Sequence, residues 1–186
     1  MLNKGKLIIV FIALKVTINC VGIAYSQPPV TYEKYIRATS GTNVHLHINS
    51  LTRYEYGYEL SNWTRLEVNI PDSVSDEFGN FTLITDWFFN AYTDSDSLYG
   101  DYGRSIGVDY ITLTASAGNT EAGNRMTFIE DGIELGSVPQ ELARGTGPGR
   151  FIILVSFSIG QKENKRLIGE PFDYYFSDLW FQIYSE

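Results

Sequence analysis

His45 and His47 are the only histidines of the chain, and they lie two residues apart. Side chains at this spacing share one face of a β-strand, here opposite Val44, Leu46 and Ile48. Such a pair can supply two of the three or four ligands that zinc needs, and carboxylates would have to supply the rest. No sequence feature identifies those carboxylates, and the solvent-facing side of an edge strand explains the pair equally well. Both interpretations stay open at the level of sequence.

An acidic segment contains Asp94, Asp96 and Asp101. Its spacing is similar to the start of an EF-hand calcium loop, but Leu98 occupies a ligand position of that pattern and Tyr99 replaces its glycine. The EF-hand is therefore excluded. A weak, irregular calcium site of the kind found in β-sandwich proteins and a solvated acidic loop are the remaining interpretations, and we predict no other cofactor.

The segment Gly103-Arg104-Ser105-Ile106-Gly107 matches the G-x-S-x-G pattern of a hydrolase nucleophile elbow. In that motif a helix follows the serine, and a histidine later in the chain acts as its base. Here a strand-like segment follows and no histidine lies beyond residue 47, so the pattern predicts a glycine-flanked turn. Paired carboxylates remain the one route to catalysis, but 22 acidic residues allow no choice of a pair. The sequence favours a protein that is not an enzyme.

Tyr54, Tyr56 and Tyr58 repeat at a spacing of two residues, and Trp63 follows them. On a strand the three tyrosines would project from one face. Rigid aromatic side chains of this kind stack on sugar rings or on partner side chains at low entropic cost. Packing against aromatic neighbours within a sheet is the alternative. The four residues form the predicted ligand-binding set.

Apolar residues alternate with polar ones in segment after segment, which is typical of half-buried strands. The run Phe151–Phe157 is apolar on both faces and predicts a central strand, whereas only Val138–Arg144 predicts a short helix. Turns rich in Gly, Pro, Asn and Asp separate the segments. About eight or nine strands at this spacing predict an all-β fold, an antiparallel immunoglobulin-like β-sandwich. The alternating segments are residues 43–49, 52–59, 64–70, 81–92, 107–115, 126–130 and 174–184.

The N-terminus predicts a cleavable signal peptide over residues 1–26, followed by a single β-sandwich domain over residues 27–186. Lys4 and Lys6 precede the apolar run Leu7–Leu14, and Ala24-Tyr25-Ser26 forms a small-x-small cleavage site before Gln27. The apolar run is about half the length that a membrane-spanning helix requires. We therefore expect an exported protein without a transmembrane span, located outside the cell, at the cell surface or in the periplasm.

Cys20 provides an alternative to this cleavage, because a lipid can be attached to a cysteine late in a leader. Lipid attachment favours a small residue before the cysteine, and Asn19 fits that requirement poorly. If cleavage follows Ser26, no cysteine remains. Hydrophobic burial must then stabilise the domain without disulfide bonds.

The predicted processing also changes the charge of the protein. Removing Lys4, Lys6 and Lys15 leaves 11 of the 14 basic residues against 22 acidic ones, a net charge of −11. Nucleic acid binding requires clustered Lys and Arg that displace counterions from phosphates. Nucleic acid is therefore excluded as an expected partner.

From about Asn43 onwards, the order of these segments resembles small exported β-sandwich proteins of Bacteroidota that are related to fimbrial subunits. The resemblance implies an immunoglobulin-like sandwich and a surface, adhesive or filament-related role, with other protein subunits or host and cell-surface glycans as partners. No functional residue carries over from it. The segments that carry the resemblance are Leu46–Ile48, Ile84–Ala91, Val108–Leu113, Gly145–Arg150 before Phe151–Ile159, and Tyr174–Tyr184.

One feature departs from the fimbrial pattern. Pilins that complete a neighbouring subunit do so with an alternating apolar N-terminal extension, whereas Val30 and Tyr32 are followed in register by Lys34. The sequence thus predicts an exported structural or adhesive cell-surface protein, of which a fimbrial-type subunit is one form. A carbohydrate-binding module that uses surface aromatic residues is the alternative.

Overall fold

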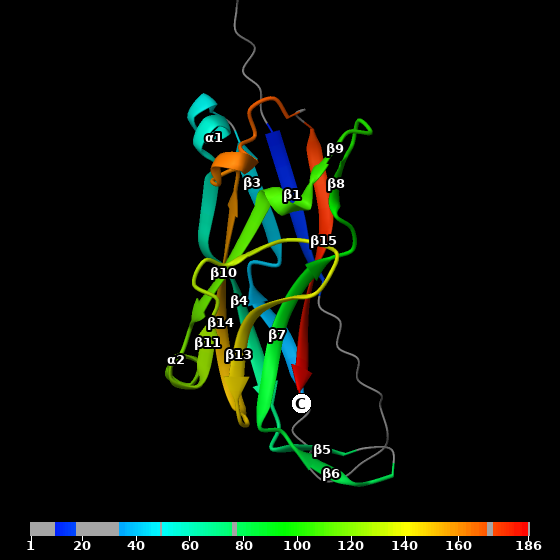
Figure 1. Ribbon diagram of the computed structural model, residues 1–186, viewed down its shortest axis with the longest axis vertical. Coiled ribbons are helices and arrows are strands. Elements are labelled where there is room, and N and C mark those ends of the chain that lie inside the picture. The colour runs from blue at the N-terminus through cyan, green and yellow to red at the C-terminus, as the bar shows by residue number, and fades with distance from the viewer. Residues whose placement is uncertain (1–9, 18–33, 49, 76–77, 171–172, 186) are drawn as a thin grey trace, which may run out of the picture.

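The computed structural model describes residues 10–17, 34–48, 50–75, 78–170 and 173–185, with the backbone alone for residues 10–17, 47–48 and 75. Two β-sheets of eight and five strands pack face to face, and a short two-stranded hairpin lies at one end (Figure 1). The predicted all-β sandwich is confirmed. It contains more strands than the eight or nine expected, because further strands lie outside the alternating segments, among them residues 10–17, 35–40, 73–75, 97–100 and 140–146.

The five-stranded sheet is antiparallel and has β14 at its centre. The inward side chains of this strand, Phe151, Ile153, Val155 and Phe157, are fully buried, which confirms the prediction of a central strand over this run. The order across the sheet is β12 (Ile133–Glu134), β10 (Ile111–Ala117), β14 (Gly149–Ile159), β4 (Tyr58–Ile70) and β2 (Tyr35–Ser40).

The eight-stranded sheet is antiparallel between its described strands except for one pair, because β1 runs parallel to β15. Two short strands, β8 (Ser97–Gly100) and β9 (Ser105–Gly107), extend it beside β15. The order along the main path is β11 (Met126–Phe128), β13 (Gln140–Thr146), β7 (Asp86–Thr93), β15 (Tyr174–Ser185), β1 (Val10–Thr17) and β3 (Asn43–Ile48).

The remaining elements are short and lie largely at the ends and edges of the sandwich. Helix α1 (Leu51–Tyr56) lies at one end, the hairpin of β5 (Ser73–Ser75) and β6 (Phe81–Leu83) lies at the other, and α2 (Thr120–Arg125) lies beside β11 (Figure 1). Two 3₁₀ turns, η1 (Val108–Tyr110) and η2 (Glu163–Lys165), complete the set. None of the helices in the described part of the chain has the length and apolar run that crossing a membrane requires.

Two predictions of local structure are wrong. Residues 51–56 form a helix instead of a strand: the Ser50 side chain accepts a hydrogen bond from the Arg53 N–H, and Gly57 ends the helix at a φ of 80°. Both are the usual signals of helix ends. The predicted helix Val138–Arg144 is largely the strand β13, because that segment pairs with β7 and β11. Tertiary pairing overrides local propensity there.

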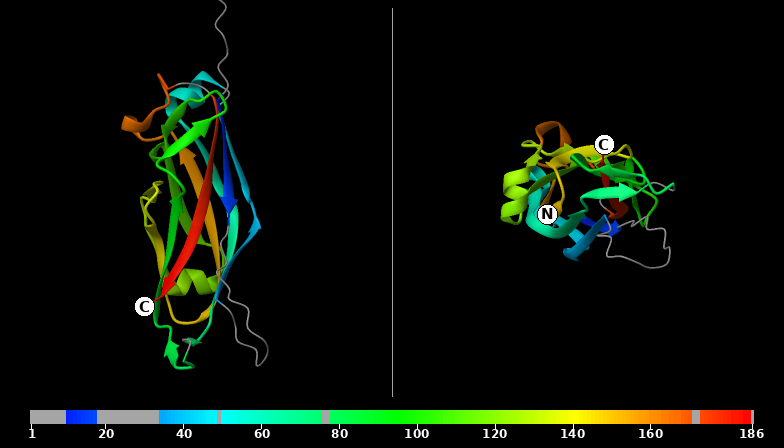
Figure 2. Two further views of the ribbon diagram at one scale, coloured as in Figure 1. Left: turned by 90° about the vertical axis from the view of Figure 1, so that its right-hand side faces the viewer. Right: turned by 90° about the horizontal axis from the view of Figure 1, so that it is seen from below.

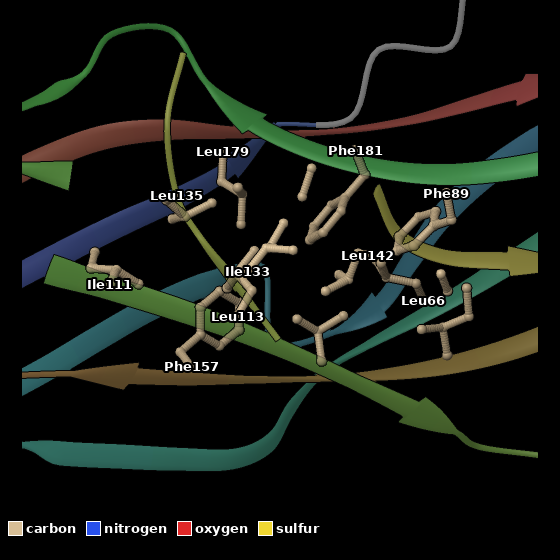
Figure 3. Close-up of a cluster of buried hydrophobic side chains, with 14 of the residues drawn as sticks. Leu66, Phe89, Ile111, Leu113, Ile133, Leu135, Leu142, Phe157, Leu179 and Phe181 are labelled. Atoms are coloured by element: carbon tan, nitrogen blue, oxygen red, sulfur yellow. The ribbon is translucent and has the colours of Figure 1, made fainter. Parts of the chain in front are cut away.

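The core lies between the two sheets and consists of their inward side chains (Figure 3). Phe89 and Phe181 stack at 5.3 Å between ring centroids, and Trp87 packs against Phe151 at 4.9 Å. A Cβ atom at Gly145 would lie 2.2 Å from the Trp87 ring. Only glycine allows the tryptophan to pack there, so the Gly-rich turn predicted before β14 also has a packing role.

Candidate functional site

The predicted tyrosine set does not lie on one face of a strand. Tyr54 and Tyr56 belong to α1, whereas Tyr58 begins β4. The Tyr54 hydroxyl donates a hydrogen bond to the Glu170 carbonyl at 2.7 Å, and burial raises the pKa of this tyrosine. Its hydroxyl is therefore engaged within the fold.

Cations or backbone groups contact the other members of that set. The Arg166 guanidinium lies 5.6 Å from the Tyr56 ring centroid. Trp63 lies further along β4, and its indole N–H donates to the Asn43 carbonyl at 2.9 Å. Tyr56 and Trp63 are exposed by 59% and 43%, which makes them useful as reference aromatic residues away from the face described below.

The predicted metal ligands are not assembled into a site within the described residues. His45 is exposed on β3 between the buried residues Val44 and Leu46, as its spacing predicts. The side chain of His47 lies outside the described residues. Where side chains are described, no three His, Cys, Asp or Glu residues are grouped so that they could hold a metal ion.

The three aspartates of the acidic segment have different surroundings. Asp94 accepts a hydrogen bond from the Ser177 hydroxyl at 3.0 Å. Asp96 accepts one from the Ser137 N–H at 2.7 Å, which lowers the pKa of this carboxyl group. Asp101 lies in the turn after β8. The contacts of Asp94 and Asp96 tie the segment to β15 and to the loop before β13.

Strand β1 consists of residues that belong to the predicted leader. It pairs in parallel with β15 from Phe11 opposite Tyr174 to Thr17 opposite Trp180, and antiparallel with β3 on its other side. Its neighbours turn buried side chains toward the core, among them Leu46 on β3 and Leu179 on β15. A segment predicted to be removed from the chain therefore separates two strands of the larger sheet.

The outer face of the same sheet has an unusual aromatic content. On β7 and β15, alternate residues point away from the core, and their cross-strand partners are aromatic in two cases: Trp180 opposite Tyr92, and Tyr184 opposite Phe88. Phe176 lies opposite Tyr99 of β8 in the same way. We call this set the aromatic row; its members are Phe88, Tyr92, Tyr99, Phe176, Trp180 and Tyr184.

Two amides lie within the aromatic row. Gln182 pairs with Asn90 between the Trp180–Tyr92 pair and the Tyr184–Phe88 pair. The Asn90 Oδ1 atom is shielded from solvent and accepts no hydrogen bond from the described residues. A shielded carbonyl oxygen without a donor is rare in folded proteins and costs stability.

A hollow of about 200 Å³ adjoins one end of the row. Phe88 and Arg144 line it together with Arg125 from α2, and Asp86, Thr127 and Thr146 add a carboxylate and two hydroxyls. The Arg144 guanidinium lies 5.8 Å from the Phe88 ring centroid. The hollow therefore combines an aromatic wall with donors and acceptors of hydrogen bonds.

The outer face of the five-stranded sheet contains a different cluster, which we call the Glu67 cluster. The Glu67 carboxylate is 4% exposed and accepts hydrogen bonds from Arg150 at 2.6 Å and Arg37 at 3.1 Å. The Tyr35 hydroxyl donates a third at 2.5 Å. The bonds from Arg150 and Tyr35 lower the pKa of Glu67 to about 2. Because its donors are in place, this cluster stabilises the fold.

The sequence contained a partial signal for the aromatic row and none for the Glu67 cluster. Tyr174, Phe176, Trp180 and Tyr184 recur at even positions of the closing segment, outside the set that fills the core. Their partners on β7 cannot be identified without the register between the two strands. Comparison with protein-family models gives no match, and comparison with curated proteins gives none either.

Proposed function

We propose that the protein is an exported structural or adhesive subunit of the cell surface, and that a strand from a second subunit replaces β1 after processing. The observation that carries this proposal is the place of β1. It lies between β15 and β3 and consists of residues with the features of a cleavable leader. The order of strand segments that resembles fimbrial-type subunits also favours it.

Cleavage after Ser26 would remove the strand that joins β15 to β3. β15 would then become an edge strand of the sheet and β3 would lose the strand with which it pairs, so both would have unpaired N–H and C=O groups. Such an edge is a template for strand addition from another chain. The buried side chains of Val44, Leu46, Tyr175 and Leu179 would also lose an adjacent strand, and covering apolar surface provides further driving force for replacement.

The first test is to determine the processing and assembly of the protein in its native cells. We expect a chain that begins at Gln27, fractionates with surface material and sediments as a species larger than one subunit. N-terminal sequencing and native mass measurement of that fraction check both points. An uncleaved monomer that stays inside the cell would overturn the proposal.

The second test concerns the strand position itself. A synthetic peptide of residues 10–17 should raise the Tm of a chain comprising residues 27–186. Leu14 pairs with the buried Val44, so the same peptide with Leu14→Asp should have a much smaller effect. Equal effects of the two peptides, or no effect of either, would contradict strand replacement.

A further inference from the structure

The outward positions of β7 and β15 contain no aliphatic side chain. Their apolar members are all aromatic, and Asp, Asn and Gln occupy the other positions. The cores of protein interfaces combine aromatic residues with methionine and arginine and have few charged groups. A face that alternates rings with carboxylate and amide groups differs from that composition. It instead suits a ligand that offers apolar faces and hydroxyl groups in turn.

The aromatic row is long and follows the strand direction. Phe176, Trp180 and Tyr184 are each four residues apart on β15, which corresponds to about 13 Å between neighbours at the rise of a strand. In the left view of Figure 2, β15 runs along most of the sandwich on the side facing the viewer. An extended chain of several sugar rings fits such a surface better than a compact small molecule.

An exposed amide lies between the rings of the row. Gln182 is exposed on β15 between Trp180 and Tyr184, and it pairs with Asn90 of β7. Its amide can accept and donate hydrogen bonds at once, so it offers a polar partner to the hydroxyl groups of a ligand that stacks on the rings. The Asn90 Oδ1 atom is shielded from solvent and is not itself open to such a ligand.

We propose that the aromatic row binds an extended, neutral polysaccharide, whose rings stack on Trp180, Tyr184 and Phe176 and whose hydroxyl groups reach Gln182 and the hollow beside Phe88. Aromatic side chains provide rigid contact area at low entropic cost. A net charge of −8 and the acidic residues Asp86 and Asp178 on the same face disfavour an acidic polysaccharide. This binding does not require export or strand replacement.

The test is native affinity electrophoresis of the full chain in gels that contain hydroxyethylcellulose, arabinoxylan, galactomannan or mixed-linkage β-glucan. We expect at least one of these neutral polymers to retard the protein, and alginate to have no effect. Trp180→Ala and Tyr184→Ala should each weaken the retardation by about tenfold, as expected for loss of one stacked ring. Gln182→Ala should weaken it less.

Matched controls come from exposed aromatic residues elsewhere on the molecule. Tyr56→Ala and Trp63→Ala remove rings of similar exposure, 59% and 43%, outside the row and should leave the retardation unchanged. Because Tyr184 is 55% exposed, its variant tests binding even if Trp180→Ala lowers the Tm.

Four results would overturn the proposal. They are retardation by none of the neutral polymers, retardation by alginate alone, full binding by Tyr184→Ala, and loss of binding in both control variants. A dimer in analytical ultracentrifugation that dissociates on Trp180→Ala would assign the face to a second copy of the chain instead.

Discussion

The two outer faces of the sandwich differ in how their polar groups are satisfied. On the five-stranded sheet, Glu67 is buried and accepts hydrogen bonds from Tyr35, Arg37 and Arg150. On the eight-stranded sheet, the Asn90 Oδ1 atom is shielded but accepts no hydrogen bond from the described residues. The polar groups of the first face are satisfied within the chain, whereas the second face has an unsatisfied acceptor among rings that are at least partly exposed to a ligand.

The comparison distinguishes a surface whose side chains stabilise the fold from a surface that a ligand could contact. Residue types alone do not make this distinction. Clusters of charged residues are candidate functional sites, because perturbed pKa values are common at such sites. Glu67 is one such perturbed group, but its donors are in place, and its two arginines lie on the neighbouring strands. The candidate binding face has aromatic residues and amides instead.

The largest expected effect is on the Glu67 cluster. Glu67→Ala should lower the free energy of unfolding by about 3 kcal/mol, because two charge-assisted bonds and one hydroxyl bond to a buried acceptor are lost. Gln182→Ala on the other face should change it by less than about 0.5 kcal/mol. Urea unfolding of both variants checks the contrast. Similar losses of unfolding free energy for Glu67→Ala and Gln182→Ala would show that the two faces contribute equally to stability.

The pH dependence of stability provides the next, smaller effect. The pKa of Glu67 is about 2 in the fold against an ordinary value of 4.5, so the unfolded chain binds a proton at higher pH than the folded protein does. Its contribution to stability is present above pH 4.5 and is lost as the pH falls toward 2.

We expect the wild-type protein to lose about 2 kcal/mol more than Glu67→Gln between pH 6 and pH 3, from a shift of about 1.4 kcal/mol per pKa unit. The glutamine keeps the shape of the side chain but does not titrate in this range. Urea unfolding at several pH values measures the difference. If the unfolding free energies of the two proteins change in parallel with pH, the Glu67 cluster does not cause the loss of stability at low pH.

Periodic segments with one dominant pattern could be predicted from the sequence. The central strand β14 and the closing strand β15 follow directly from their apolar residues, because buried faces leave a period of two in the sequence. The same rule gave the wrong element for residues 51–56. There Ser50 and Gly57 supply the helix ends. The three tyrosines at a spacing of two residues predicted a strand instead, so these capping residues were not taken into account.

The candidate sites depended on information that alternation does not contain. Trp180 meets Tyr92 only through the register of β15 against β7, and register between distant strands is set by the whole sheet. Glu67 looked like an ordinary outward residue of β4, because its donors lie on β2 and β14. Sequence alone could therefore indicate aromatic surface at Tyr54, Tyr56, Tyr58 and Trp63, whereas the aromatic row becomes visible only with the register between strands.

The smallest expected effect tests whether the aromatic row serves binding more than stability. Phe88 and Tyr184 face each other across β7 and β15 at 6.3 Å between ring centroids, with planes 35° apart. A double-mutant cycle with Phe88→Ala and Tyr184→Ala should give a coupling of about 0.5 kcal/mol, the usual range for an outward cross-strand pair.

The inward pair Phe89 and Phe181 is the matched control, since its rings stack at 5.3 Å between the same two strands. Each alanine substitution there should cost about 3 kcal/mol or more, because a cavity forms in the core. A coupling above about 2 kcal/mol for the outward pair would show that the row stabilises the sheet as the core does. A small coupling, together with small losses for each single variant, would mean that the exposed rings add little to folding, which is the condition under which selection for a ligand accounts for them.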